Sequence, residues 1–91
     1  MLSATDRKAL KARAHKLEPV VIVGAKGLTD EVVKEIDTAL KAHELIKVRA
    51  AALERDEREG ILKTICERTG AEAVQAIGKI FVIYRKSNED R

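Results

Sequence analysis

Residues 19–29 have the sequence PVVIVGAKGLT, and this stretch decides the fold class. The β-branched run at 20–23 predicts a strand, and the proline before it is tolerated at the first position of a strand. Because the run is apolar without alternation, we expect this strand to be buried on both faces. The loop 24–27 ends the strand, and Thr29 is a residue type that caps helices. A strand, a short glycine loop and a capped helix predict an α/β unit.

Helices and strands alternate on both sides of this unit. Apolar residues three or four apart predict helices, and Gly78-Lys79 predicts a hairpin turn between the last two strands. The order α-β-α-β-α-β-β predicts a four-stranded mixed sheet packed with three helices. The predicted elements are a helix from a Ser3 or Thr5 cap to about His15, a strand at 20–23, a helix from Thr29 to near His43, a strand at 45–52, a helix at 54–69, and strands at 73–77 and 80–84.

The length of 91 residues predicts a single domain. We expect this domain to span residues 1–86, followed by a flexible polar tail at 87–91. Phe81 and Tyr84 are the only aromatic residues. This scarcity argues against the class of RNA binders that stack several bases on exposed aromatic rings.

Basic residues gather at the two ends of the sequence. Residues 1–27 contain six basic and two acidic residues, and residues 79–91 contain four basic and two acidic residues. Residues 28–78, in contrast, contain eight basic and eleven acidic residues. This asymmetry indicates a surface for a polyanion, and chance clustering on a solvated surface is the alternative interpretation.

The loop Gly24-Ala25-Lys26-Gly27 is the strongest candidate for a binding element. It precedes a predicted helix, whose first N–H groups and dipole would favour an anion. The two glycines would let a sugar-phosphate backbone come close, and Lys26 adds a cation. GXXG loops hold the nucleic-acid backbone in this way in KH domains. A tight turn without function is the alternative, and the spacing of a P-loop is absent.

Basic side chains flank this loop in the predicted fold. They lie on one side of the first helix, on one face of the second strand and at the end of the last strand. Alternative roles are a helix C-terminal cap for His15 and a solvated sheet face for Lys47 and Arg49. The predicted RNA-binding residues are Gly24, Ala25, Lys26, Gly27, Arg7, Lys8, Lys11, His15, Lys47, Arg49 and Arg85.

No catalytic, cofactor or metal site is predicted. Cys66 is the only cysteine and lies in an apolar helical stripe, which is typical of a buried thiol in a reducing cytoplasm. The two histidines lack partners at metal-ligand spacing, and His43 is expected to make a structural hydrogen bond. Without an apolar run of membrane-spanning length or a signal peptide, we expect a cytoplasmic protein without a membrane span.

Three stretches of the chain resemble the CRM domain family (chloroplast RNA splicing and ribosome maturation). They are LEPVVIVGAKGLT at 17–29, HELIKV at 43–48 and VQAIGKIFVIYR at 74–85. The resemblance is to the stand-alone bacterial YhbY-like members and extends from about residue 3 to residue 86. It implies a fold similar to the C-terminal domain of translation initiation factor 3, with residues 24–27 as a GxxG loop.

The same resemblance implies a function in ribosome assembly. It implies an RNA-binding protein, not an enzyme, that associates with precursor 23S rRNA in particles of the large ribosomal subunit. We expect a monomer. The alternative is a protein-interaction module that docks a basic ribosomal protein on the acidic start of the third helix. The acidic residues there are Glu54, Asp56, Glu57 and Glu59, which otherwise serve the helix dipole.

Overall fold

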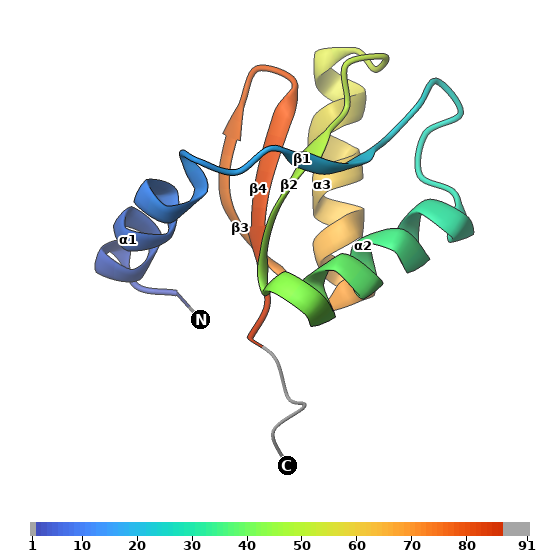
Figure 1. Cartoon of the computed structure of the whole chain (residues 1–91). Coiled ribbons are helices and arrows are strands. Elements are labelled where there is room, and N and C mark those ends of the chain that lie inside the picture. The colour runs from blue at the N-terminus through green and yellow to red at the C-terminus, as the bar shows by residue number, and fades with distance from the viewer. Residues whose placement is uncertain (1, 87–91) are drawn as a thin grey trace.

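The structure is a computed structural model that describes residues 2–86 (Figure 1). Three helices and four strands follow one another in the predicted order. No helix in this described part of the chain is long and apolar enough to cross a membrane. The predicted tail at 87–91 lies outside the described residues. The elements are α1 (Ala4–Ala14), β1 (Pro19–Ile22), α2 (Asp30–His43), β2 (Leu45–Arg49), α3 (Arg55–Thr69), β3 (Glu72–Ile77) and β4 (Ile80–Tyr84).

The four strands form one mixed sheet in the order β1-β2-β4-β3. β1 and β2 are parallel, with α2 as the connection between them, whereas β4 is antiparallel to both β2 and β3. The hairpin between β3 and β4 has the predicted glycine turn, where Gly78 takes a φ of 55°. The predicted fold class, a single α/β domain with a mixed sheet and three helices, is therefore confirmed.

The sheet separates two helical layers, with α1 on one face and with α2 and α3 together on the other (Figure 1). Each layer closes its own apolar core cluster against the sheet. The larger cluster, under α2 and α3, includes Ile36, Leu40, Ile65, Phe81 and Ile83. The smaller cluster, under α1, consists of Leu10, Ala14, Leu45, Val74 and Val82.

The prediction that the strand at 20–23 is buried on both faces is wrong. β1 is an edge strand of the sheet, and α1 does not extend over it. Val21 and Val23 point into the larger core and are 4% and 0% exposed, whereas Val20 and Ile22 are 52% and 66% exposed. The physical reason is that a continuous apolar run does not reveal on which side of a sheet a covering helix stops.

The second strand is shorter than predicted. β2 ends at Arg49 instead of Ala52, because the chain leaves the sheet at Ala50. The Ala50 N–H donates to the Lys79 carbonyl oxygen at 2.8 Å, which holds this exit beside the β3–β4 turn. Leu53 then turns inward and joins the larger core. The predicted alternation within β2 is confirmed, since Ile46 and Val48 are buried whereas Arg49 is exposed.

Arg85 ties the end of the sheet to both helices of the larger layer. Its Nη1 atom donates to Asp37 Oδ1 and to the Thr69 carbonyl oxygen, each at 2.7 Å. Its Nη2 atom donates to the Asp37 carbonyl oxygen at 3.2 Å. The Thr69 carbonyl at the end of α3 would otherwise lack a helical partner. The hydrogen bond from Arg85 holds the pKa of the Asp37 carboxyl below its ordinary value of 3.8.

Replacing Arg85 with alanine is expected to lower the free energy of unfolding by about 2 kcal/mol, since it removes charge-assisted hydrogen bonds to partly buried acceptors. Lys86→Ala, at the exposed neighbouring position, is the matched control and should change this free energy by less than about 0.5 kcal/mol. Urea unfolding followed by circular dichroism measures both. Equal stability of the two variants would contradict the structural role of Arg85.

The lowered pKa of Asp37 also predicts a pH dependence of stability. A carboxyl whose pKa is lowered by folding stabilises the protein at pH values above its unfolded pKa, and this contribution is lost as the pH falls through the folded value. The stability difference between the wild type and Asp37→Asn should therefore be present at pH 7 and shrink below about pH 4. Thermal unfolding at a series of pH values measures it. A difference that grows toward low pH would contradict the assignment.

Candidate nucleic-acid interface

Residues 24–27 form a tight turn immediately after β1. The Gly27 N–H donates to the Gly24 carbonyl oxygen at 3.0 Å, which places Ala25 and Lys26 at the two central, exposed positions. Gly27 has a φ of 79°, a left-handed conformation that side chains disfavour. At Gly24, by contrast, a Cβ atom would meet nothing within 4 Å. The turn itself therefore explains Gly27 but not Gly24.

The structure does not support the predicted phosphate site at the N-terminus of the following helix. Two residues separate the turn from α2, and the Thr29 hydroxyl already accepts the Val32 N–H at 3.2 Å. The first turn of α2 also carries the carboxylates of Asp30 and Glu31, which repel a phosphate. What the loop offers to an anion is the Lys26 ammonium group and the exposed backbone of the turn.

The turn and the basic helix do not lie side by side. Figure 1 shows α1 at one side of the molecule and the loop between β1 and α2 at the other, with the sheet between them. β1 connects the two regions, and Arg49 on β2 is the register partner of Ile22 on β1. The Val23 N–H donates to the Arg49 carbonyl oxygen at 2.7 Å. Arg49 therefore lies beside the end of β1, next to the turn.

Two of the predicted RNA-binding residues are used by the fold itself. Arg7 donates from Nε to the Ala73 carbonyl oxygen at 3.5 Å and from Nη1 to the Leu2 carbonyl oxygen at 3.3 Å. Arg85 makes the inter-helix contacts described above. Because both guanidinium groups are held by internal acceptors, we assign these two arginines to stability and not to ligand contact.

The remaining predicted cations face solvent. Lys8 and Lys11 are exposed on α1, and His15 is exposed at the C-terminal cap of this helix. Lys26 is exposed in the turn, and Arg49 is exposed on β2. Among residues 2–86, none of these five side chains takes part in a salt bridge. They are available for a ligand.

Lys47 has an intermediate position. It is half-buried, and its Nζ atom donates to the Leu17 carbonyl oxygen at 3.0 Å, which fixes the link between α1 and β1. An ammonium group has three donors, so this bond leaves two of them for an anion.

Lys79 is a cation of this region that sequence reasoning left out. It is exposed in the β3–β4 turn, and its carbonyl oxygen holds the N–H of Ala50, the residue that follows Arg49. Its position in a turn was evident from the Gly78-Lys79 pair. Its closeness to Arg49 depends on the pairing of β2 with β4, in which Arg49 and Ile80 are partners.

The charged side chains at the start of α3 make local contacts within this segment. The Glu57 carboxylate accepts the Glu54 N–H at 2.9 Å, and Glu59 forms an ion pair with Arg55 at 3.9 Å. Arg58 lies among these residues and donates to the Leu53 carbonyl oxygen at 2.6 Å. The surface at the start of α3 is therefore mixed in charge.

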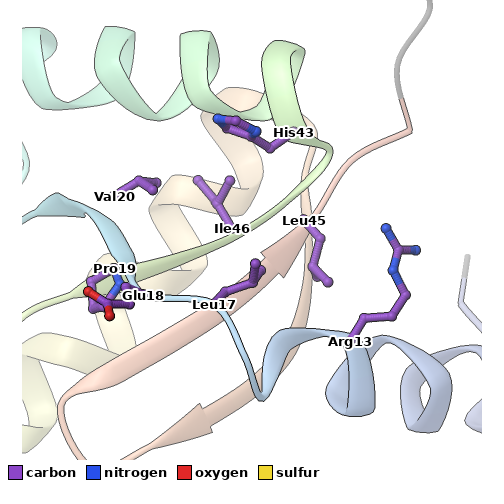
Figure 2. Close-up of a pocket in the computed structure, with 8 residues that line it drawn as sticks. All are labelled: Arg13, Leu17, Glu18, Pro19, Val20, His43, Leu45 and Ile46. Carbon is purple, nitrogen blue, oxygen red and sulfur yellow. The ribbon is translucent and has the colours of Figure 1, made fainter.

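An apolar groove of about 360 Å³ lies where the link from α1 enters β1 (Figure 2). Figure 2 shows the side chains of Arg13 on α1 and His43 at the end of α2 on opposite sides of this groove, with Leu17, Leu45 and Ile46 between them. His43 is exposed and is not part of a buried network. No group of three metal-ligating side chains occurs in the described residues.

Comparison with known proteins identifies the family of the chain. The CRS1 / YhbY (CRM) domain matches residues 2–85. An RNA-binding protein of Haemophilus influenzae is 47% identical, over 97% of this chain and 89% of that protein. A probable RNA-binding protein of Pseudomonas aeruginosa is 43% identical, over 94% of this chain and 83% of that protein.

A solved structure shows the same fold. The solution structure of a hypothetical protein from Staphylococcus aureus aligns with a TM-score of 0.86 at 35% identity, covering 100% of this chain and 95% of that chain. The two relatives are named for RNA binding and not for an enzymatic activity, in agreement with the expectation of a non-catalytic protein. The chain belongs to the CRS1/YhbY (CRM) domain family.

Proposed function

We propose that this protein binds RNA and assists assembly of the large ribosomal subunit by associating with precursor 23S rRNA. Membership of the CRM family and the names of its relatives support RNA as the ligand. The observation that carries the proposal is the division between basic residues that the fold uses and basic residues that it leaves exposed. The exposed set runs from the turn after β1, across the sheet, to α1.

The exposed cations form a continuous path. Lys26 occupies the turn that follows β1, and Arg49 lies on β2 beside the last residue of β1. Lys47 is on the same face of β2, two residues earlier, and lines a depression together with Lys11 of α1 and the cap residue His15. A path of this kind fits a sugar-phosphate backbone that crosses the edge of the sheet, because cations spaced along it neutralise phosphates.

Close approach of the backbone is the role proposed for Gly24. The fold tolerates a side chain at this position, since the space is open and the backbone is not left-handed. A glycine there leaves the carbonyl and N–H groups of the turn accessible to a bound sugar-phosphate chain. Lys26 at the tip of the turn adds one ionic contact.

Association with precursor particles is the part of the proposal that rests on the family resemblance. It would place the protein in the cytoplasm as a monomer bound to precursors of the large subunit. Crosslinking in cells, followed by mapping of the recovered nucleotides, tests this role. We expect crosslinks in precursor 23S rRNA, together with sedimentation of the protein at the position of immature large subunits. Crosslinks confined to other RNAs would overturn it.

The glycines of the turn predict separable effects on binding and on stability. Gly24→Asp should lower RNA affinity by about tenfold or more through repulsion of phosphate, with an unchanged melting temperature. Gly24→Asn, which has the same size without the charge, separates repulsion from steric exclusion.

Gly27→Ala should instead lower the free energy of unfolding by roughly 1–2 kcal/mol because of its left-handed φ. Filter binding measures the RNA affinity of these variants, and thermal unfolding measures their stability. Full affinity of Gly24→Asp would contradict the role of the turn.

The exposed cations predict a salt dependence of RNA affinity. Lys26→Gln and Arg49→Gln should each weaken binding and each reduce the slope of log affinity against log salt by about 1. Lys63→Gln on α3, across the sheet from α1, is the matched control and should leave the slope unchanged. Fluorescence anisotropy between 50 and 200 mM salt, roughly the range over which phosphate contacts are lost, measures it. An affinity insensitive to salt would contradict phosphate contact.

A further inference from the structure

Part of the sheet face that carries α1 is not covered by any described element. The row, which we call the open sheet face, consists of one residue from each strand: Ile22, Arg49, Ile80 and Ile77. Ile80 is partly buried, and the other three are exposed. These residues are register partners, so they form a line across all four strands. Ile22 and Ile77, at the two ends of the line, are 66% and 61% exposed.

The position of α1 explains why this row is open. The buried residues of α1 are Leu10 and Ala14, which pack on Leu45, Val74 and Val82 in the neighbouring part of the sheet. The helix then ends at Ala14, and the Leu17 N–H donates to the Ala14 carbonyl oxygen at 2.9 Å as the chain turns toward β1. α1 therefore packs on the neighbouring part of the sheet and does not extend over the row of isoleucines.

Exposed isoleucines in the middle of such a charged protein need an explanation. Two large β-branched side chains on one face gain nothing from contact with water, and exposed apolar surface of this kind is used in interaction sites. A depression of about 270 Å³ adjoins the row, and its lining contains Lys11, His15 and Lys47 but no carboxylate. The patch thus combines apolar contact surface with positive charge.

This combination selects one kind of ligand. Unpaired nucleotides have apolar base faces and anionic phosphates, whereas duplex RNA stacks its base faces away and presents mainly sugars and phosphates. A second copy of this chain would bring another set of exposed cations against the first, which like-charge repulsion disfavours. Phe81 is buried and therefore cannot stack on a base. The aliphatic side chains of the row would provide the apolar contact with bases instead.

We propose that the open sheet face binds unpaired nucleotides of the RNA, with bases packed on Ile22, Ile80 and Ile77 and with the Arg49 guanidinium on a phosphate of the same segment. This inference rests on the proposed RNA-binding function and specifies its substrate class as RNA with a single-stranded segment. The row crosses four strands and is about 14 Å long, enough for a short segment of chain. Lys26 and Lys79, in turns that follow β1 and precede β4, hold the flanking phosphates.

The test uses the double variant Ile22→Thr/Ile77→Thr in the full chain. Threonine keeps the β-branch that strands favour while it removes apolar surface, and both positions are exposed, so the fold should be retained. The probes are a blunt RNA duplex and the same duplex with a short single-stranded extension. We expect the wild type to prefer the extended RNA, and the double variant to lose about tenfold in affinity for it while changing less than about twofold toward the blunt duplex.

The outcomes separate this inference from the proposed function. Equal binding of both RNAs by the wild type, or an unchanged preference in the double variant, would overturn the inference and leave RNA binding intact. Absence of salt-sensitive binding to either RNA would overturn the proposed function itself. A wild-type dimer that becomes monomeric in the double variant, with no change in RNA preference, would assign the row to self-association instead.

A second measurement is independent of affinity. Photocrosslinking from 4-thiouridine placed in the single-stranded extension, with the crosslinked residue identified by fragment spectra, should map to Ile22 or Ile77. The same label placed inside the duplex should crosslink to the turn at 24–27 or to α1 instead. Crosslinks from the extension that are confined to α2 or α3 would overturn the placement of unpaired nucleotides on the open sheet face.

Discussion

Parallel pairing of β1 with β2 is the constraint on which the candidate interface depends. Two parallel neighbours require a crossover connection, and here this connection is the turn at 24–27 followed by α2. The pairing also brings Arg49 beside Ile22 and directs the Val23 N–H to the Arg49 carbonyl oxygen. The turn, the edge of the sheet and the first cation of the path thus lie together because one strand pair holds them.

Basic residues in this protein divide into two groups with different physical roles. Arg7, Arg58 and Arg85 donate to main-chain carbonyl groups, and this suits arginine because a guanidinium group offers several fixed donors. Lysines supply most of the exposed charge on α1 and in the turns. Mobile ammonium groups suit contacts with phosphates, which need charge more than a fixed geometry. Lys47, which donates to the Leu17 carbonyl oxygen, and the exposed Arg49 depart from this division.

The two glycines of the turn illustrate how one motif combines folding and binding requirements. Gly27 has a left-handed backbone and contributes to the shape of the turn. Gly24 has neither a positive φ nor a neighbour that a side chain would strike, so the fold places no demand on it. In isolation the sequence pattern makes the two positions look equivalent. Their backbone angles and surroundings show that the fold favours a glycine only at Gly27.

The sequence by itself determined the order of the elements, the turn at 24–27, the inward face of β2 and the family. These features depend on local periodicity, on the conformational preferences of glycine and proline, and on three motifs in order. Only the tertiary structure decided that β1 is an edge strand, that Arg7 and Arg85 are bound internally, and that Lys79 lies close to Arg49. The reason is physical: the burial of a strand and the partners of a long side chain depend on residues far away in the chain. The run at 20–23 therefore predicted a strand correctly, whereas its exposed face became evident only once α1 and the strand order were in place.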